Sequence, residues 1–171
     1  MKKLSCIVLI LFAGLFFTGC SSDDNGGSKA EQEWIKFVQK HLIGEWTPYQ
    51  IDVKPIIGEA VFSSPYPHTP SCNKDLLVLK NDFTGNFNHY VQGCQMGVTN
   101  FKWNHRLGEL SFKLDNGTEI PMILLKKSEK VLVLAVPAKA VKQYLIPLFP
   151  QIEYIEESQL NLLFANITLV K

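Results

Sequence analysis

The stretch CNKDLLVLKNDFTGNFNHYVQGC, residues 72–94, decides the fold. It holds two strand-like runs, LLVLK and NFNHYV, on either side of NDFTG, which is typical of a turn. In a hairpin centred on Phe83, opposed residues have numbers that add to 166, as Cys72 and Cys94 do. Opposed Cα atoms lie ~4.5–5.5 Å apart, which a disulfide can span. The stretch therefore predicts a hairpin closed by a Cys72–Cys94 disulfide.

Alternation of apolar and polar side chains extends from this hairpin through the segments that follow it. A strand packed on one face and solvated on the other has this pattern. The turn sequences DNGT at 115–118 and KSEK at 127–130 separate further strand-like runs, as expected in an up-and-down antiparallel meander. The residues predicted to face inward, with His89 and His105 on the same face, are Leu77, Leu79, Phe87, Phe101, Trp103, Phe112 and Met122.

Two segments near the C-terminus interrupt the meander. Within residues 137–158, Val141, Tyr144, Leu145 and Leu148 share a helical face, which predicts a short helix before the last strand. This helix either caps one end of a barrel or packs on its outside. In the final run, the apolar parity changes, and a bulge near residues 165–166 would reconcile the two halves.

A short helix is predicted ahead of the first strand. Ser28 and Glu31 have the spacing of a capping box. One apolar stripe at helical period follows, and it favours packing on the core over an exposed partner surface. The stripe consists of Ala30, Trp34, Phe37, Val38 and His41.

The N-terminus has the pattern of a secretory signal. Lys2 and Lys3 precede an apolar run from Ile7 to Phe17, which is shorter than the ~20 residues that span a membrane. Phe17-Thr18-Gly19-Cys20 resembles the lipobox of bacterial lipoproteins, although leucine is usual at the position of Phe17. This resemblance implies a signal peptide over 1–19 and acylation of Cys20. The alternative is an ordinary secreted protein in which Cys20 is a spare thiol.

Residues 20–29 are predicted to form a flexible tether, because they are rich in glycine, serine and acidic residues. Ser22-Asp23-Asp24 also resembles the surface-export signal of Bacteroidota lipoproteins, although a plain solvated linker has the same composition. We therefore expect attachment to the outer membrane through acylated Cys20, with exposure at the cell surface, or otherwise at the periplasmic face.

The formal net charge of the whole chain is +1. Loss of Lys2 and Lys3 brings it near −1 without a basic block, which argues against nucleic acid as a partner. With Cys6 removed and Cys20 acylated, Cys72 and Cys94 remain in a compartment where disulfides persist. A metal site that uses these cysteines with His68 or His89 is a weaker alternative, since no second ligand lies at a short spacing.

The domain over 30–171 resembles the lipocalin-like domains common in Bacteroidota lipoproteins. The likeness is carried by Gly44-Glu45-Trp46, by Cys72-Asn73-Lys74-Asp75 before a strand, by the NDFTGNF turn, by Cys94, by Phe101-Lys102-Trp103 and by the closing LNLLFANITLVK. It implies a mainly β fold, an antiparallel up-and-down barrel of about eight strands. The chain lacks the Thr-Asp-Tyr motif of true lipocalins.

A barrel of eight strands is filled by its own side chains or holds one small ligand. The first possibility we consider is a membrane-anchored carrier of a small hydrophobic molecule. Its predicted ligand-binding residues are Leu79, Phe87, His89, Phe101, Trp103, Phe112 and Met122.

The second possibility is a surface module with a filled barrel, whose loops bind a protein or glycan. Residues 57–71 motivate it, because Phe62, Tyr66 and His68 lie among prolines that would hold them in solvent. Catalytic motifs such as Gly-x-Ser-x-Gly or His-Glu-x-x-His are absent from the sequence. The sequence therefore predicts no enzyme, no catalytic residue, no metal and no cofactor.

Overall fold

A computed structural model of the chain describes residues 29–106 and 108–171. The predicted signal peptide, Cys20 and Ser28 of the capping box lie outside the described residues. No helix in the part that is described has the length and apolar character needed to cross a membrane.

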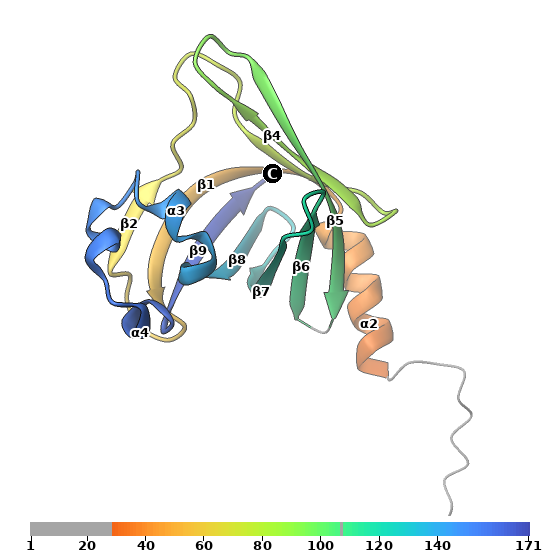
Figure 1. The fold of residues 1–171 in the computed structure, drawn as a ribbon. Coiled ribbons are helices and arrows are strands. Elements are labelled where there is room, and N and C mark those ends of the chain that lie inside the picture. The colour runs from red at the N-terminus through yellow and green to blue at the C-terminus, as the bar shows by residue number, and fades with distance from the viewer. Residues whose placement is uncertain (1–28, 107) are drawn as a thin grey trace, which may run out of the picture.

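In the described part of the chain, nine antiparallel strands form one sheet, and eight of them close into a barrel (Figure 1). The strands are β1 Gly44–Pro55, β2 Phe62–Pro65, β3 Leu76–Leu79, β4 Thr84–Tyr90, β5 Met96–Arg106, β6 Glu109–Leu114, β7 Glu119–Lys127, β8 Val131–Pro137 and β9 Leu163–Val170. From β3 to β9 each strand pairs with the next one in sequence, as in a meander. This confirms the predicted mainly β, antiparallel up-and-down barrel of eight strands.

Strand β1 closes the ring because it has partners on both edges. Its first residues, 44–46, pair with β3, and residues 47–55 pair with β9 along the opposite edge. The short strand β2 pairs with residues 50–53, on the edge of β1 that β3 leaves free. β2 was not predicted, since its sequence FSSP has little strand character.

The register of the β3–β4 hairpin differs from the predicted one. Leu77 lies opposite Phe87 and Leu79 lies opposite Gly85, so paired residues add to 164 and not to 166. The predicted inward face is nevertheless correct. A disulfide does join Cys72 to Cys94, with their Cα atoms 5.2 Å apart, but it lies beyond the paired strands. It connects the loop before β3 to the turn between β4 and β5.

The predicted bulge in the last strand is also wrong. β9 pairs with β8 in one uninterrupted register, and the irregularity lies in the partner strand β1, between Pro48 and Gln50. Leu160 belongs to a helix that precedes β9, and Phe164 lies within β9 but lines a hollow on the outside of the barrel instead of its interior, so no bulge is needed.

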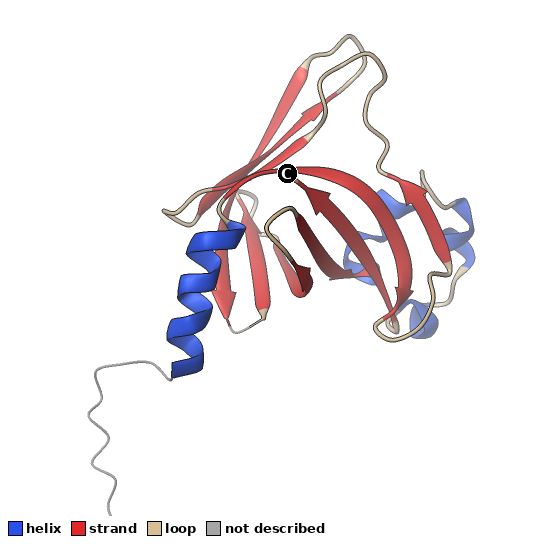
Figure 2. Cartoon of the chain, turned by 180° about the vertical axis from the view of Figure 1, so that it is seen from behind, coloured by secondary structure: helices blue, strands red, loops and turns tan. Residues whose placement is uncertain are grey.

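The predicted N-terminal helix is present as α2, Lys29–Phe37, which continues into a π-helical turn η1, Val38–Leu42. Trp34, Val38 and Leu42 are buried at helical spacing and belong to the main core of the barrel. Figure 2 shows α2 beside the barrel, on the side away from the second group of helices. Trp34, Phe37 and Val38 of the predicted stripe therefore pack on the core, whereas Ala30 is exposed.

The segment between β8 and β9, which we call the helical insertion, contains four short helices. They are η2 Ala138–Val141, α3 Lys142–Leu145, η3 Pro150–Tyr154 and α4 Glu157–Leu160. Leu145, Phe149 and Ile152 are buried against Ile51 and Val53 of β1 in a second core cluster. The insertion thus caps one end of the barrel (Figure 1).

Candidate functional site

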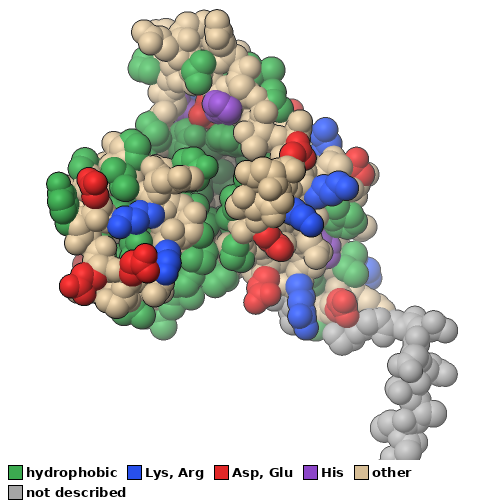
Figure 3. All heavy atoms as spheres, in the orientation of Figure 1, with side chains coloured by type: hydrophobic (Ala, Val, Ile, Leu, Met, Phe, Trp, Pro, Cys, Tyr) green, Lys and Arg blue, Asp and Glu red, His purple; other side chains and the backbone are tan. Residues whose placement is uncertain are grey.

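The interior of the barrel is not filled by its own side chains. It holds a cavity of about 510 Å³, which is within the range of ~300–1,000 Å³ typical of small-molecule sites. Figure 3 shows one face of the molecule hollowed between the helical insertion and strands β5 to β7, and the side chains in the hollow are hydrophobic. The cavity is therefore open to solvent on this side.

The walls of the cavity come from alternate residues of the barrel strands. Four of the predicted ligand-binding residues line it, namely Phe87, Phe101, Phe112 and Met122. Further wall residues were not singled out as ligand-binding. They include Leu77, Leu114, Ile120, Leu134, Ile167 and Leu169. Period-two alternation brings these side chains to one interior, whereas contact with a guest stays a prediction.

The mouth of the cavity is built from two segments outside the meander. Tyr66 and Pro67 come from the loop after β2, and Tyr144, Pro147 and Leu148 come from the helical insertion. Tyr144 is 64% exposed, so it lies at the rim. The sequence placed Tyr144 and Leu148 on a helix face that could cap the barrel, but it gave no signal that Tyr66 would meet them there.

Leu79 and Trp103 lie elsewhere in the barrel. Both are almost fully buried in the main core together with Trp34 and Val38, towards the end where α2 packs. The indole N–H of Trp103 donates to the backbone oxygen of Thr84 at 3.0 Å. These two residues are not among those that line the cavity.

His89 and His105, the two candidates for a polar contact with a guest, are also not among the lining residues. The imidazole of His89 lies over Gly97 and stacks on Phe87, with ring centroids 6.0 Å apart. His105 lies among the rings of Trp34, Phe83 and Trp103. Its Nδ1 atom is buried without a hydrogen-bond partner among the described residues, and burial lowers the pKa of the imidazole.

A buried carboxylate lies directly behind the mouth. Asp75 is 5% exposed. Its Oδ2 atom accepts a hydrogen bond from the hydroxyl of Tyr66 at 3.0 Å, and its Oδ1 atom accepts one from the backbone N–H of Tyr90 at 2.9 Å. Two donors thus satisfy a charge that would otherwise be costly to bury.

His68 ties the same loop to the barrel. Its Nδ1 atom accepts the backbone N–H of Asp75 at 3.1 Å, so the ring proton sits on Nε2, which donates to the backbone oxygen of Pro48 at 2.8 Å. Burial, followed by the charge of Asp75 and the hydrogen bond to it, raises the pKa of Tyr66 far above its ordinary value. The phenol therefore stays protonated, and its O–H group donates a hydrogen bond to Asp75.

These contacts change the interpretation of residues 57–71. The aromatic side chains expected to project into solvent are used within the fold. Phe62 stacks on Phe149 of the helical insertion, with ring centroids 5.6 Å apart, while Tyr66 and His68 take part in the Asp75 network. The observation that motivated a loop-based recognition surface is therefore weakened.

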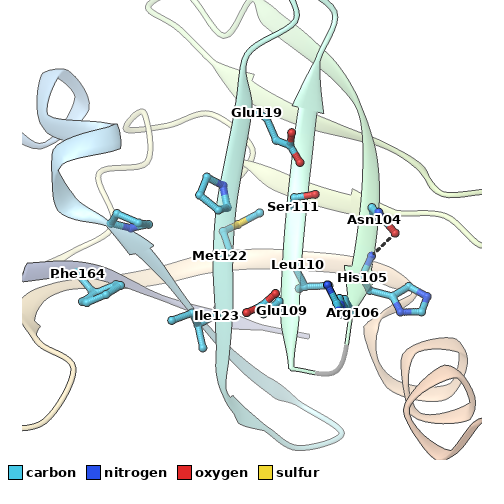
Figure 4. A pocket seen from close by; sticks show the side chains of 12 residues that line it. Asn104, His105, Arg106, Glu109, Leu110, Ser111, Glu119, Met122, Ile123 and Phe164 are labelled. Atoms are coloured by element: carbon cyan, nitrogen blue, oxygen red, sulfur yellow. Dashed lines mark hydrogen bonds between the residues drawn. The ribbon is translucent and has the colours of Figure 1, made fainter. Parts of the chain in front are cut away.

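A second hollow, of about 410 Å³, lies on the outer face of strands β5 to β7. Figure 4 shows its side chains, among them Arg106, Glu109 and Glu119, which are of mixed charge. The His105 side chain points from this face towards α2 (Figure 4). Charged side chains lie among its apolar ones, whereas no residue of the described chain that lines the interior cavity is charged, so the hollow is a weaker candidate for an apolar guest.

Within residues 29–106 and 108–171, no group of three or more His, Cys, Asp or Glu side chains is arranged to hold a metal ion. The sulfur atoms of Cys72 and Cys94, considered above as possible ligands, are bonded to each other.

Comparison with known proteins gives a likeness at the level of structure. No family model matches the chain, and no relative was found among curated proteins. Among solved structures, the chain is similar to a lipocalin-like protein from Bacteroides uniformis ATCC 8492, with a TM-score of 0.48 and 10% sequence identity. The match covers 76% of this chain and 97% of that one. The closed ring of eight antiparallel strands described above is an up-and-down barrel, an architecture that lipocalins also have.

Proposed function

We propose that this protein binds a small hydrophobic molecule inside its barrel and does no chemistry on it. The observation that carries the proposal is the cavity of about 510 Å³, whose walls are aromatic and aliphatic side chains from β3 to β9. Burial of apolar surface contributes roughly 25 cal/mol per Å². A guest that fits this cavity would therefore be held mainly by the hydrophobic effect.

A filled barrel that binds partners through its loops is the competing proposal. The open interior and the internal use of Phe62 and Tyr66 both favour the carrier over this module.

The carrier proposal is tested by titrating the purified chain with 1-anilinonaphthalene, an uncharged fluorophore that brightens in apolar surroundings. Ala165 lines the cavity, whereas Thr168, on the same strand, points to the opposite face. We expect saturable binding to the wild type and to Thr168→Phe, and loss of binding in Ala165→Phe, which fills the cavity. Ile167→Trp is a second filling variant, should Ala165→Phe fail to fold. Equal binding to all variants would contradict the proposal.

We further propose that acylated Cys20 holds the protein on the outer membrane, at the cell surface. The lipobox-like sequence and the acidic tether that follows it support this placement. Two or more acyl chains anchor a protein stably where one does not. In cell fractionation, the wild type should sediment with membranes and resist extraction by high salt, while Cys20→Ala should lose its incorporated lipid. Digestion of intact cells with a protease, or labelling with an antibody, would distinguish exposure at the cell surface from a position at the periplasmic face.

A further inference from the structure

We propose that the cavity selects uncharged guests and rejects the anionic form of the same skeleton, and that Asp75 contributes to this rejection. The inference rests on the proposed function, because it concerns the chemistry of the guest in the same cavity. It is carried by the charges that surround the lining residues and by the hydrogen bonds that those residues already make.

The cavity wall offers no cation to an anionic guest. None of the described residues that line it carries a charge, and its polar side chains are those of Tyr66, Thr99 and Tyr144. Transfer of an ionised carboxylate into such surroundings without a partner is far more costly than transfer of a hydroxyl. An anion would thus need a counter-charge at the mouth of the cavity.

The buried charge near the mouth has the opposite sign from the one required. The carboxylate of Asp75 lies 3.0 Å from the hydroxyl oxygen of Tyr66, which is itself a lining residue. Within a protein, where the effective dielectric constant is well below that of water, two like charges at short range repel each other strongly. Asp75 therefore opposes a second negative charge at this part of the mouth.

The donors beside the mouth are already in use. The proton of the Tyr66 hydroxyl goes to Asp75, and the Nε2 proton of His68 goes to the backbone oxygen of Pro48. Neither group can therefore donate this proton to an anionic head group without losing its present hydrogen bond. An alcohol or an aromatic amine is uncharged at pH 7 and brings its own donor proton, so it does not need a proton from these groups.

The lysines of the helical insertion are engaged elsewhere. Lys139 pairs with Glu157 at 2.9 Å, and Lys142 donates to the backbone oxygen of Glu153 at 3.3 Å. Neither lysine is among the lining residues. The insertion thus brings tyrosine, proline and leucine side chains to the mouth but brings no free ammonium group.

The test compares two pairs of compounds in which the members share an apolar skeleton and only one carries an anionic group. The first pair is 1-anilinonaphthalene and its sulfonate, 8-anilinonaphthalene-1-sulfonate. The second pair is dodecan-1-ol and dodecanoic acid at pH 7, measured by displacement of 1-anilinonaphthalene. Since tenfold in affinity corresponds to only ~1.4 kcal/mol, we expect the neutral member of each pair to bind at least about tenfold more tightly.

Asp75→Asn removes the charge and keeps the shape of the side chain. We expect this variant to bind the anionic compounds more tightly than the wild type does, with a smaller change for the neutral compounds. Glu129→Gln, which removes an exposed carboxylate from the turn between β7 and β8, is the matched control and should leave the selectivity unchanged. If Asp75→Asn fails to fold, Asp75→Ser, which also removes the charge and keeps a hydrogen-bonding group, takes its place, and the wild-type affinities for the four compounds decide the selectivity.

The outcomes separate this inference from the proposed function. If none of the four compounds binds, the carrier proposal fails and the selectivity fails with it. If neutral and anionic members bind equally, and Ala165→Phe abolishes both, the carrier proposal stands and the selectivity is wrong. If the anions bind less well but Asp75→Asn leaves the ratio unchanged, the part assigned to Asp75 is overturned.

Discussion

The ammonium group of Lys171 lies 4.4 Å from the centroid of the Trp46 ring. Trp46 is fully buried at the start of β1, and its indole N–H donates to the backbone oxygen of Leu42 at 2.7 Å. Lys171 also donates to the backbone oxygen of Ile43 at 3.3 Å. One cation thus joins the residues after β9 to the junction between η1 and β1.

Replacing Lys171 with Met keeps most of the aliphatic stem and removes the charge. A cation over an aromatic ring contributes ~0.5–1 kcal/mol at an exposed site. We therefore expect Lys171→Met to lower the free energy of unfolding by about 1 kcal/mol, measured as a lower urea midpoint at constant slope. Lys171→Arg retains a cation and should lose less. Equal midpoints for Met and wild type would show that the contact adds no stability.

The faces of the barrel strands could be predicted from the sequence because a strand places alternate side chains on opposite sides. Phe101, Phe112 and Met122 fall on the interior face as expected. Alternation does not determine the height along the barrel at which each inward side chain lies. Trp103 follows Phe101 by two residues and shares its face, yet it lies in the packed core with α2 and not at the cavity.

The register of the first hairpin shows the same limit. Sums of 164 and 166 place the same residues on the same face, so a hydrophobic pattern cannot distinguish them. The turn decides between them. Asp82 accepts hydrogen bonds from the backbone N–H and the hydroxyl of Thr84, and Phe83 adopts a positive φ of 61°. These local contacts pair Lys80 with Thr84 and centre the turn on Asp82.

The mouth of the cavity could not be predicted because it depends on contacts between distant segments. Tyr66 reaches it because β2 pairs with β1 and because Asp75 holds the loop that follows. Tyr144 reaches it because the helical insertion buries Leu145 and Phe149 against β1. No spacing in the sequence encodes either meeting.

The Cys72–Cys94 disulfide should contribute strongly to stability. The cysteines are 22 residues apart, and closure of a loop of this length stabilises the fold by roughly 3 kcal/mol in the chain-entropy model. We expect the double variant Cys72→Ser with Cys94→Ser to unfold at a correspondingly lower urea concentration. Wild type treated with a reductant should match it. Peptide maps that are identical with and without reductant would show that the bond is absent.

Protonation of His105 should destabilise the fold. Burial lowers its pKa below the ordinary value of 6.5, so below that pH the unfolded chain binds this proton more readily than the folded chain does. Stability assigned to neutral His105 is therefore complete above about pH 6.5 and is lost as the pH falls through the lower, folded-state value.

His105→Phe tests this dependence. The Nδ1 atom of His105 has no hydrogen-bond partner among the described residues, and its ring lies among aromatic rings, so a phenyl ring should be accommodated. We expect the wild type to lose stability between pH 7.5 and 5.5, and the variant to lose less over the same range. Urea midpoints at several pH values measure the two slopes. Parallel slopes would indicate that other groups cause the dependence.

Two glycines on neighbouring strands should respond differently to the same substitution. A Cβ atom on Gly85 would overlap the ring of Phe101 and lie 2.7 Å from the backbone oxygen of Val78. Phe101 is 4% exposed and stacks on Phe112, with ring centroids 4.3 Å apart, so it has little room to move. Overpacking of a core costs ~1–3 kcal/mol, and we expect Gly85→Ala to lower stability by this amount.

Gly97→Ala is the matched control. A Cβ atom there would overlap the imidazole of His89, but this side chain is half-buried and can rotate away. An alanine also restricts the unfolded chain, which stabilises by ~0.4–1 kcal/mol where the backbone conformation suits it. Gly97→Ala should therefore leave the urea midpoint close to that of the wild type. Equal losses of stability in the two alanine variants would contradict this explanation. They would mean that the imidazole of His89 is held as rigidly as the phenyl ring of Phe101.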